Sequence, residues 1–181
     1  MAILNVMQVG EECLTKKCKP VKTITERIRE LVSDMFETMY DSGGVGLAAP
    51  QVGVLKRLFV IDVTPDPDPD QPEEEIVPEK YVMINPEILE TSGEQTGYEG
   101  CLSYAGMSGL VTRPNLVRVS YTDLDGERKE LTAEGLLARC ILHENDHLDG
   151  IMYMTHVEGE IYTNEKLAEM LREEENSGGE S

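Results

Sequence analysis

Two of the three histidines in the chain lie in one short segment, His143-Glu144-Asn145-Asp146-His147, which matches the pattern H-E-x-x-H. Residues four apart share one face of a helix, so both imidazoles can reach the same metal ion. Glu144 lies at an adjacent angle, where it can exchange a proton with a water molecule that the metal activates. The segment therefore predicts a hydrolytic metal site on a helix.

A third protein ligand is needed, and its identity would decide the class of hydrolase. In metzincins a third histidine stands where this chain has Tyr153, which excludes that class. Glu165, in Asn164-Glu165-Lys166-Leu167-Ala168-Glu169, resembles the later glutamate ligand of thermolysin-like peptidases. Cys140 shares the helix with both histidines, so these three side chains would converge poorly. Cys101 would approach from a separate strand or loop and complete a His2Cys tetrahedron, although such a cysteine taken alone is more often a buried thiol.

Three segments together resemble, in order and spacing, the signature motifs of the peptide deformylase family. They are Gly44-Val45-Gly46-Leu47-Ala48-Ala49-Pro50-Gln51, Glu99-Gly100-Cys101-Leu102-Ser103 and His143-Glu144-Asn145-Asp146-His147-Leu148-Asp149-Gly150. The resemblance runs from the N-terminal segment to about residue 157. It implies an enzyme that removes the formyl group from the N-terminal formylmethionine of newly made polypeptides and releases formate.

The resemblance also implies a role for each matched residue. The metal ligands would be Cys101, His143 and His147, holding one divalent ion, with Fe(II) first and Zn(II), Ni(II) or Co(II) as alternatives. Glu144 would be the general acid/base. Gln51 and the backbone N–H of Leu102 would bind the oxyanion that develops on the formyl oxygen.

We expect the substrate to contact Val45, Gly46, Glu99 and Leu102, since the small residues of Gly44-Val45-Gly46 would admit a peptide backbone. The methionine side chain needs an apolar pocket, and the candidates for its lining are Val45, Leu102, Ile141 and Leu142. Glu99 and Arg113 are expected to form an ion pair that steadies the segment carrying Cys101.

Hydrophobic periodicity and turn signals predict a single α+β domain, with mostly antiparallel sheets around a central helix that carries the H-E-x-x-H motif. The expected helices span residues 25–40, about 133–147 and 163–172. The expected strands span residues 57–63, 81–84, 116–122 and 127–131, the last two joined by the turn Asp125-Gly126.

The net charge of −19 comes from 35 acidic and 16 basic residues. Residues 64–79 hold five prolines and seven acidic residues, which predicts an exposed, mobile loop. Residues 173–181 are expected to form a disordered acidic tail, so the deformylase-like catalytic domain would span residues 1–172.

Composition excludes several classes of protein. Hydrophobic residues make up 40% of the chain, which excludes global disorder, and the acidic balance disfavours nucleic-acid binding. No apolar run is long enough to cross a membrane, and the start lacks the features of a secretory signal. We therefore expect a cytoplasmic monomer or weak oligomer that acts on N-formylmethionyl nascent polypeptides, near the ribosome but without binding nucleic acid or membrane. Two rivals remain: a small thermolysin-like metallopeptidase, and a non-catalytic paralogue that binds metal and formylated peptides.

Overall fold

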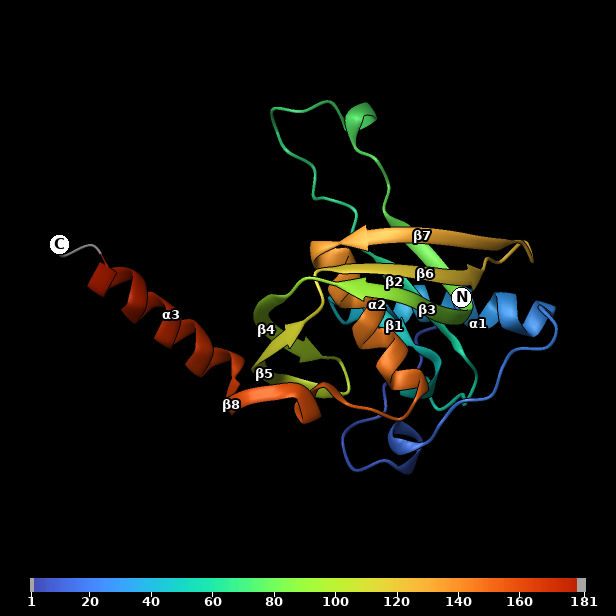
Figure 1. Cartoon of the computed structure of the whole chain (residues 1–181), viewed down its shortest axis with the longest axis horizontal. Helices are drawn as coiled ribbons and strands as arrows, with labels where there is room; N and C mark the ends of the chain where they lie inside the picture. The colour runs from blue at the N-terminus through green and yellow to red at the C-terminus, as the bar shows by residue number, and fades with distance from the viewer. Residues whose placement is uncertain (1, 179–181) are drawn as a thin grey trace.

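Two antiparallel sheets and three α-helices make up residues 2–178, the part of the chain that the computed structural model describes (Figure 1). The helices are α1 (Glu26–Asp41), α2 (Gly135–Leu148) and α3 (Asn164–Gly178). The strands are β1 (Gly46–Ala48), β2 (Leu58–Asp62), β3 (Lys80–Ser92), β4 (Gln95–Cys101), β5 (Tyr104–Arg113), β6 (Leu116–Thr122), β7 (Arg128–Glu134) and β8 (Val157–Thr163). The α+β class expected from the sequence is confirmed.

The larger sheet has the strand order β1-β2-β3-β6-β7, and the smaller one has the order β4-β5-β8. Strands β6 and β7 form the expected hairpin, with Thr122 opposite Arg128. Strand β3 is longer than the segment expected at residues 81–84, because it pairs with β2 through its first half and with β6 through its second. The sequence alone did not indicate β1, β4, β5 or β8.

Helix α1 covers one part of the larger sheet. The Oγ1 atom of Thr25 accepts a hydrogen bond from the backbone N–H of Ile28 and caps the helix. The buried face of α1 follows helical spacing and joins a core cluster with β1 and β2. This core fixes β1, and with it the segment that leads to Gln51.

Helix α2 packs against β1, β2, β6 and β7 and carries the H-E-x-x-H segment. Its apolar side includes Ala138, Ile141 and Leu148, which are fully buried in the second core cluster. His143, Glu144 and His147 are also buried, at 8%, 4% and 1% exposure. Because polar groups this deeply buried need partners, their surroundings have to satisfy them.

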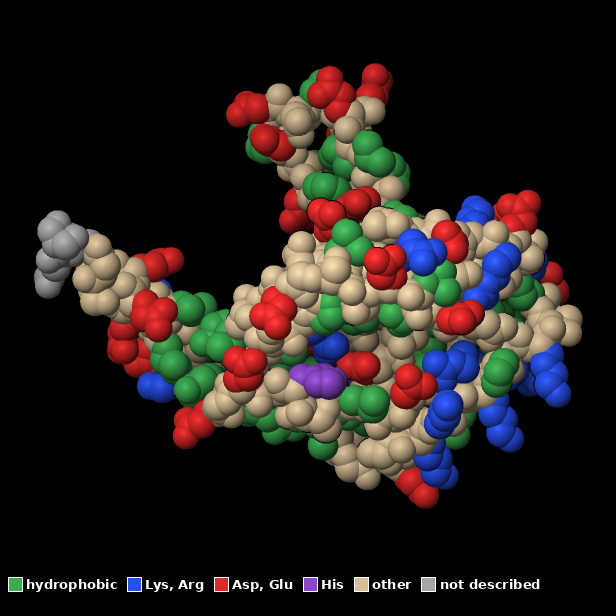
Figure 2. Space-filling model, in the orientation of Figure 1, with side chains coloured by type: hydrophobic (Ala, Val, Ile, Leu, Met, Phe, Trp, Pro, Cys, Tyr) green, Lys and Arg blue, Asp and Glu red, His purple; other side chains and the backbone are tan. Residues whose placement is uncertain are grey.

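Two acidic segments extend away from the sheets (Figures 1 and 2). Residues 64–79 form an exposed loop with one short 3-10 turn, Glu73–Glu75. Helix α3 continues through Gly178, so residues 173–178 are helical, and the disordered tail expected there is wrong for them. The acidic residues there are glutamates, which favour helix when they follow an established helix. Residues 179–181 of the expected tail lie outside the described residues.

No helix in the described part of the chain is both long and apolar enough to cross a membrane.

Candidate metal centre and active-site pocket

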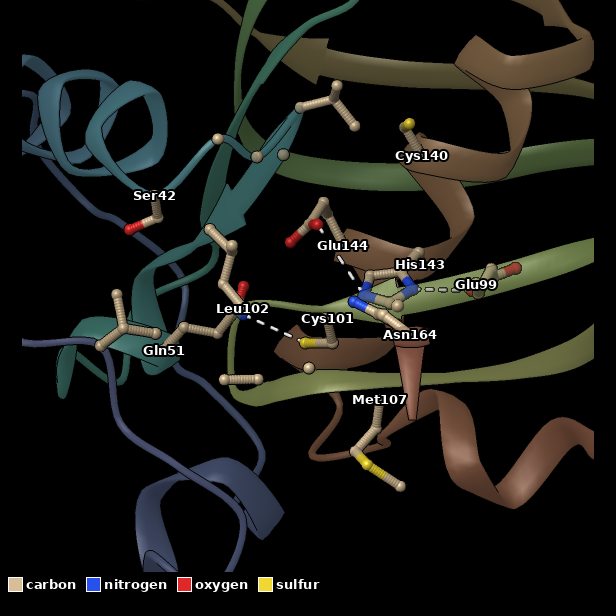
Figure 3. Close-up of a pocket in the computed structure, with 18 of the residues that line it drawn as sticks. Ser42, Gln51, Glu99, Cys101, Leu102, Met107, Cys140, His143, Glu144 and Asn164 are labelled. Carbon is tan, nitrogen blue, oxygen red and sulfur yellow. Dashed lines mark hydrogen bonds and ion pairs between the residues drawn. The ribbon is translucent and has the colours of Figure 1, made fainter. Parts of the chain in front are cut away.

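Cys101 at the end of β4 meets His143 and His147 of α2 in one cluster. Figure 3 shows Cys101, His143 and Glu144 beside the pocket. One donor atom from each residue lies within 4.8 Å of the other two. His147 Nε2 is 3.3 Å from Cys101 Sγ. Two imidazoles and one thiol at this spacing match the donor set of a tetrahedral site with one open position.

The second ring nitrogen of His143 decides which of its atoms faces the cluster. His143 Nδ1 lies 2.7 Å from Glu99 Oε1, which leaves Nε2 free to face Cys101. Burial, aided by the charges of His143 and Arg113, holds the pKa of His147 well below its usual value. A neutral imidazole is the form that binds metal, so the surroundings of His147 fit a metal ligand.

Glu99 anchors this part of the site. Its carboxylate accepts two hydrogen bonds from Arg113, at 2.6 and 3.0 Å, and one from Arg139 at 2.6 Å. Burial opposes ionisation of Glu99, but the hydrogen bonds from His143 and Arg113 outweigh it and lower the pKa to about 2. The expected ion pair between Glu99 and Arg113 is confirmed, and it fixes the strand that ends at Cys101.

Glu144, which directly follows His143 on α2, faces the same space. Its Oε1 atom lies 4.0 Å from His143 Nε2, and its buried Oε2 atom has no hydrogen-bond partner among the described residues. Burial raises the pKa of Glu144 to about 7, although the charges of His143 and Arg113 pull it down. A carboxyl group that titrates near neutral pH and has an unsatisfied oxygen suits a general acid/base.

The absence of a side chain at Gly46 makes room for this carboxylate. A Cβ atom at position 46 would lie 2.7 Å from Glu144 Oε1. Gly46 belongs to β1, which pairs with β2 and therefore cannot move freely. Gly46 thus sets the position of Glu144, in addition to making the substrate contact that the sequence predicts for Gly46.

Gln51 lies in a 3-10 turn, Ala49–Val52, directly after β1. Its Oε1 atom accepts a hydrogen bond from Ala48 N at 2.9 Å, so the amide is oriented with Nε2 toward the cluster. Nε2 donates to Ser103 Oγ at 3.1 Å and lies 3.3 Å from Cys101 Sγ. Ser103, which is fully buried, had no role in the sequence interpretation, although its place within the second motif could have indicated one.

Leu102 joins the first two motifs. Its side chain packs against Gly44, where a Cβ atom would lie 2.7 Å from Leu102 Cδ1. Its carbonyl accepts a hydrogen bond from Gln8 Nε2 at 2.9 Å. The segment after Cys101 is thereby held against Gly44, which precedes β1, and against the N-terminal segment at Gln8.

A pocket of about 650 Å³ opens beside the cluster. Four expected substrate-contacting residues line it: Val45, Gly46, Glu99 and Leu102. Ile141 and Leu142 do not, because the pocket face of α2 runs through Leu136, Arg139, Cys140 and His143, and Ile141 points into the core. Met107 and Tyr98 of the smaller sheet complete the apolar lining instead.

The other candidate ligands lie outside the cluster. Glu165 is exposed on α3. Tyr153 is buried with its ring stacked 6.0 Å from that of His143, between ring centres. Cys140 forms part of the pocket wall, where burial raises the pKa of its thiol to about 12 and keeps it protonated. Among the alternatives left open by spacing, the geometry favours Cys101.

Two histidines, a thiol and a buried glutamate in one pocket are the parts of a mononuclear metallohydrolase site. The family described as polypeptide deformylase matches residues 3–161. The chain is 51% identical over 162 residues to a peptide deformylase of Lachnoclostridium phytofermentans, covering 90% of this chain and 93% of the relative. It is 49% identical to one of Agathobacter rectalis, covering 90% and 94%.

Solved structures agree. A peptide deformylase from Thermotoga maritima superposes with a TM-score of 0.77 at 34% identity, covering 88% of this chain and all of that one. A peptide deformylase from Legionella pneumophila superposes with a TM-score of 0.78 at 43% identity, with 87% of each chain covered. The chain belongs to the peptide deformylase family. It is a hydrolase that deformylates peptides, as the three motifs predicted, and the family implies a divalent metal.

Proposed function

We propose that Cys101, His143 and His147 hold this metal, with Fe(II) as the first candidate and Zn(II), Ni(II) or Co(II) as substitutes. The convergence of their donor atoms within 4.8 Å carries the proposal. A mixed imidazole and thiolate set suits each of these ions, and availability chooses among them. A divalent metal held by these three residues would supply Lewis acidity and would lower the pKa of water at the site.

Glu144 is the general acid/base of the proposed reaction. It accepts a proton from the attacking water and returns that proton to the amine that leaves when formate is released. Its raised pKa and its unpartnered Oε2 atom support both steps. We take α2, which packs against the larger sheet, as the central helix of the domain. Glu144 is only 4% exposed on this helix, which limits contact of its carboxylate with bulk water.

Gln51 and the backbone N–H of Leu102 stabilise the negative charge that develops on the formyl oxygen. The side-chain amide of Gln51 is oriented before the substrate arrives, because both of its ends are hydrogen-bonded. Such preorganised donors act without reorganisation, and loss of one typically lowers the rate by about 10²–10³-fold.

The pocket receives the methionine side chain of an N-formylmethionyl polypeptide. Val45, Gly46 and Leu102 contact it or the adjoining backbone. The carboxylate of Glu99 is occupied by Arg113, Arg139 and His143, so any substrate contact of Glu99 comes from its backbone. We further propose a catalytic domain of residues 1–172, acting in the cytoplasm near the ribosome as a monomer or weak oligomer, without binding nucleic acid or membrane.

Formate release from a formyl-Met peptide by anaerobically prepared, iron-loaded protein tests the reaction. Metal content tests the ligand set: Cys101→Ala should lose the metal, whereas Cys13→Ala, a cysteine outside the cluster, should keep it. A thermolysin-like site using Glu165 would keep its metal in Cys101→Ala. A non-catalytic paralogue would bind the formylated peptide and release no formate.

A further inference from the structure

The third histidine of the chain, His156, lies outside the H-E-x-x-H motif and has no part in the reaction described above. It ends the 3-10 turn Tyr153–His156, which packs against β4, β5 and β8. Its Nε2 atom lies 3.1 Å from the Oδ2 atom of Asp146, in the last turn of α2. Because Asp146 pairs with Arg113 as a carboxylate, it accepts this hydrogen bond and His156 donates it.

Asp146 completes the charge balance around Glu99. Two buried guanidinium groups, those of Arg113 and Arg139, donate to the single carboxylate of Glu99. The remaining Nη1 atom of Arg113 donates to Asp146 Oδ2 at 3.0 Å. Two carboxylates therefore face two guanidinium groups. Loss of one partner from such a buried group is costly, because it leaves a charge without compensation.

These contacts form one continuous chain from the surface to a metal ligand. The side chain of His156 is 42% exposed, that of Asp146 22% and that of Arg113 6%. At the inner end, Glu99 Oε1 lies 2.7 Å from His143 Nδ1 (Figure 3). The Oδ2 atom of Asp146 accepts from both His156 and Arg113, so a displacement of this carboxylate changes the Arg113 contact directly.

The turn that carries His156 also supports His143 by packing. The ring of Tyr153, which is 1% exposed, stacks 6.0 Å from the ring of His143 between ring centres. Backbone hydrogen bonds close the turn, from Thr155 N to Met152 O at 3.2 Å and from the N–H of the next residue to Met154 O. One short turn thus contacts the metal centre twice, at the ring of His143 and through Asp146.

We propose that His156 is a positioning residue for the metal centre. Through Asp146 it holds Arg113, and Arg113 in turn holds the Glu99 carboxylate that orients His143. A charge-assisted hydrogen bond of this kind restricts the rotamer of a partly exposed carboxylate. This inference rests on the proposed function, because it takes His143 as a ligand of the metal.

The Zn(II) affinity of the protein, measured by competition with a chelator, tests the proposal. Loss of a direct partner of a ligand typically lowers metal affinity about 10–100-fold, and His156 acts from further out, so we expect His156→Ala to lower it roughly threefold. His156→Gln should restore the wild-type affinity, because the side-chain amide of glutamine can donate to Asp146 in place of the imidazole. In the Asp146→Ala protein, the further change His156→Ala should have no effect, because both substitutions remove the same contact.

Thr155→Ala is the matched control in the same turn. The Thr155 hydroxyl donates to Met152 O at 2.8 Å, within the turn itself. Its removal weakens the turn and leaves the hydrogen bond between His156 and Asp146 in place. The Zn(II) affinity of Thr155→Ala should therefore equal that of the wild-type protein.

A second measurement follows the ring of His143 by nuclear magnetic resonance in isotope-labelled, Zn(II)-loaded protein. The proton on His143 Nδ1 is shielded from water by its hydrogen bond to Glu99. Its exchange with water should be faster in His156→Ala and should return to the wild-type rate in His156→Gln.

Each of the following results would overturn the inference alone: unchanged Zn(II) affinity in His156→Ala, no recovery in His156→Gln, an equal loss in Thr155→Ala, or a full further loss when His156→Ala is added to Asp146→Ala. Absence of Zn(II) binding by the wild-type protein, or undiminished binding in Cys101→Ala, would contradict the proposed ligand set and remove the inference with it.

Discussion

The metal pocket and the projecting loop of residues 64–79 use acidic side chains in opposite ways. Glu99 and Glu144 are 5% and 4% exposed, and their surroundings shift their pKa values in opposite directions, to about 2 and about 7. The loop carries seven acidic residues, most of them exposed and without basic partners among the described residues. A carboxylate acquires a specific chemical role where burial makes its partners decisive, and a solvated one contributes mainly to the long-range field.

The largest contrast is expected for the general acid/base. Glu144→Gln should lower kcat for formyl-Met-Ala by about 10²–10⁴-fold, because the amide cannot take up or return the proton. Bound metal should stay stoichiometric. Glu73→Gln in the loop is the matched control and should change neither quantity. Equal kcat values for Glu144→Gln and Glu73→Gln would contradict the assignment of Glu144 as the general acid/base.

A second prediction concerns the space that Gly46 leaves for Glu144. Gly46→Ala would bring a Cβ atom within 2.7 Å of Glu144 Oε1, so the carboxylate must move. Misplacement by about 1 Å can cost about 10²-fold, and we expect kcat to fall by roughly that factor. Gly178→Ala at the end of α3, where none of the described residues has an atom within 4 Å of the added Cβ, should leave kcat unchanged. Steady-state formate release measures both, and an unimpaired Gly46→Ala enzyme would show that the carboxylate is not confined.

The variant Arg113→Ala tests whether the hydrogen-bond partners of the buried Glu99 carboxylate support metal binding. Arg113→Ala removes two hydrogen bonds from Glu99 and one from Asp146, so His143 is held less firmly. We expect metal affinity to fall about 10–100-fold, as is typical when support of a ligand is lost. Arg118→Ala, which removes exposed pairs with Glu90 and Glu130, should not alter it. Competition with a chelator measures the metal affinity of each variant. Equal affinities for Arg113→Ala and Arg118→Ala would show that Arg113 does not support the metal site.

Truncation after Arg172 should have the smallest effect. It removes the last turns of α3, which are exposed and lie beyond the residues that match the family. We expect kcat to stay within about twofold and unfolding free energy within about 0.5 kcal/mol, since exposed segments away from the core contribute little. Thermal or denaturant unfolding and formate release measure this. A large loss would place the domain boundary further along α3.

The local parts of the site could be predicted from the sequence, because they depend on helical spacing and motif order. His143 and His147 share a face by geometry alone, and the three motifs identified Cys101. The part of the pocket lining that α2 contributes could not be assigned, because the helical pattern does not say which of Cys140 and Ile141 faces the cavity. Arg139 was missed because its contact with Glu99 depends on how the smaller sheet meets α2.

The acidic tail shows a different limit. Its charge indicated disorder, yet residues 173–178 are helical, since glutamate tolerates helix well when a helix already precedes it. Composition therefore described the solvation of this segment correctly and its backbone incorrectly.

X-ray absorption at the metal edge tests the central claim most directly, using anaerobically prepared protein loaded with Fe(II) and, separately, with Zn(II). The account predicts one sulfur ligand, at about 2.3 Å for zinc, with two imidazole nitrogens, in both the wild-type protein and Cys13→Ala, and no bound metal in Cys101→Ala. A first shell of nitrogen and oxygen alone in the wild-type protein would contradict it.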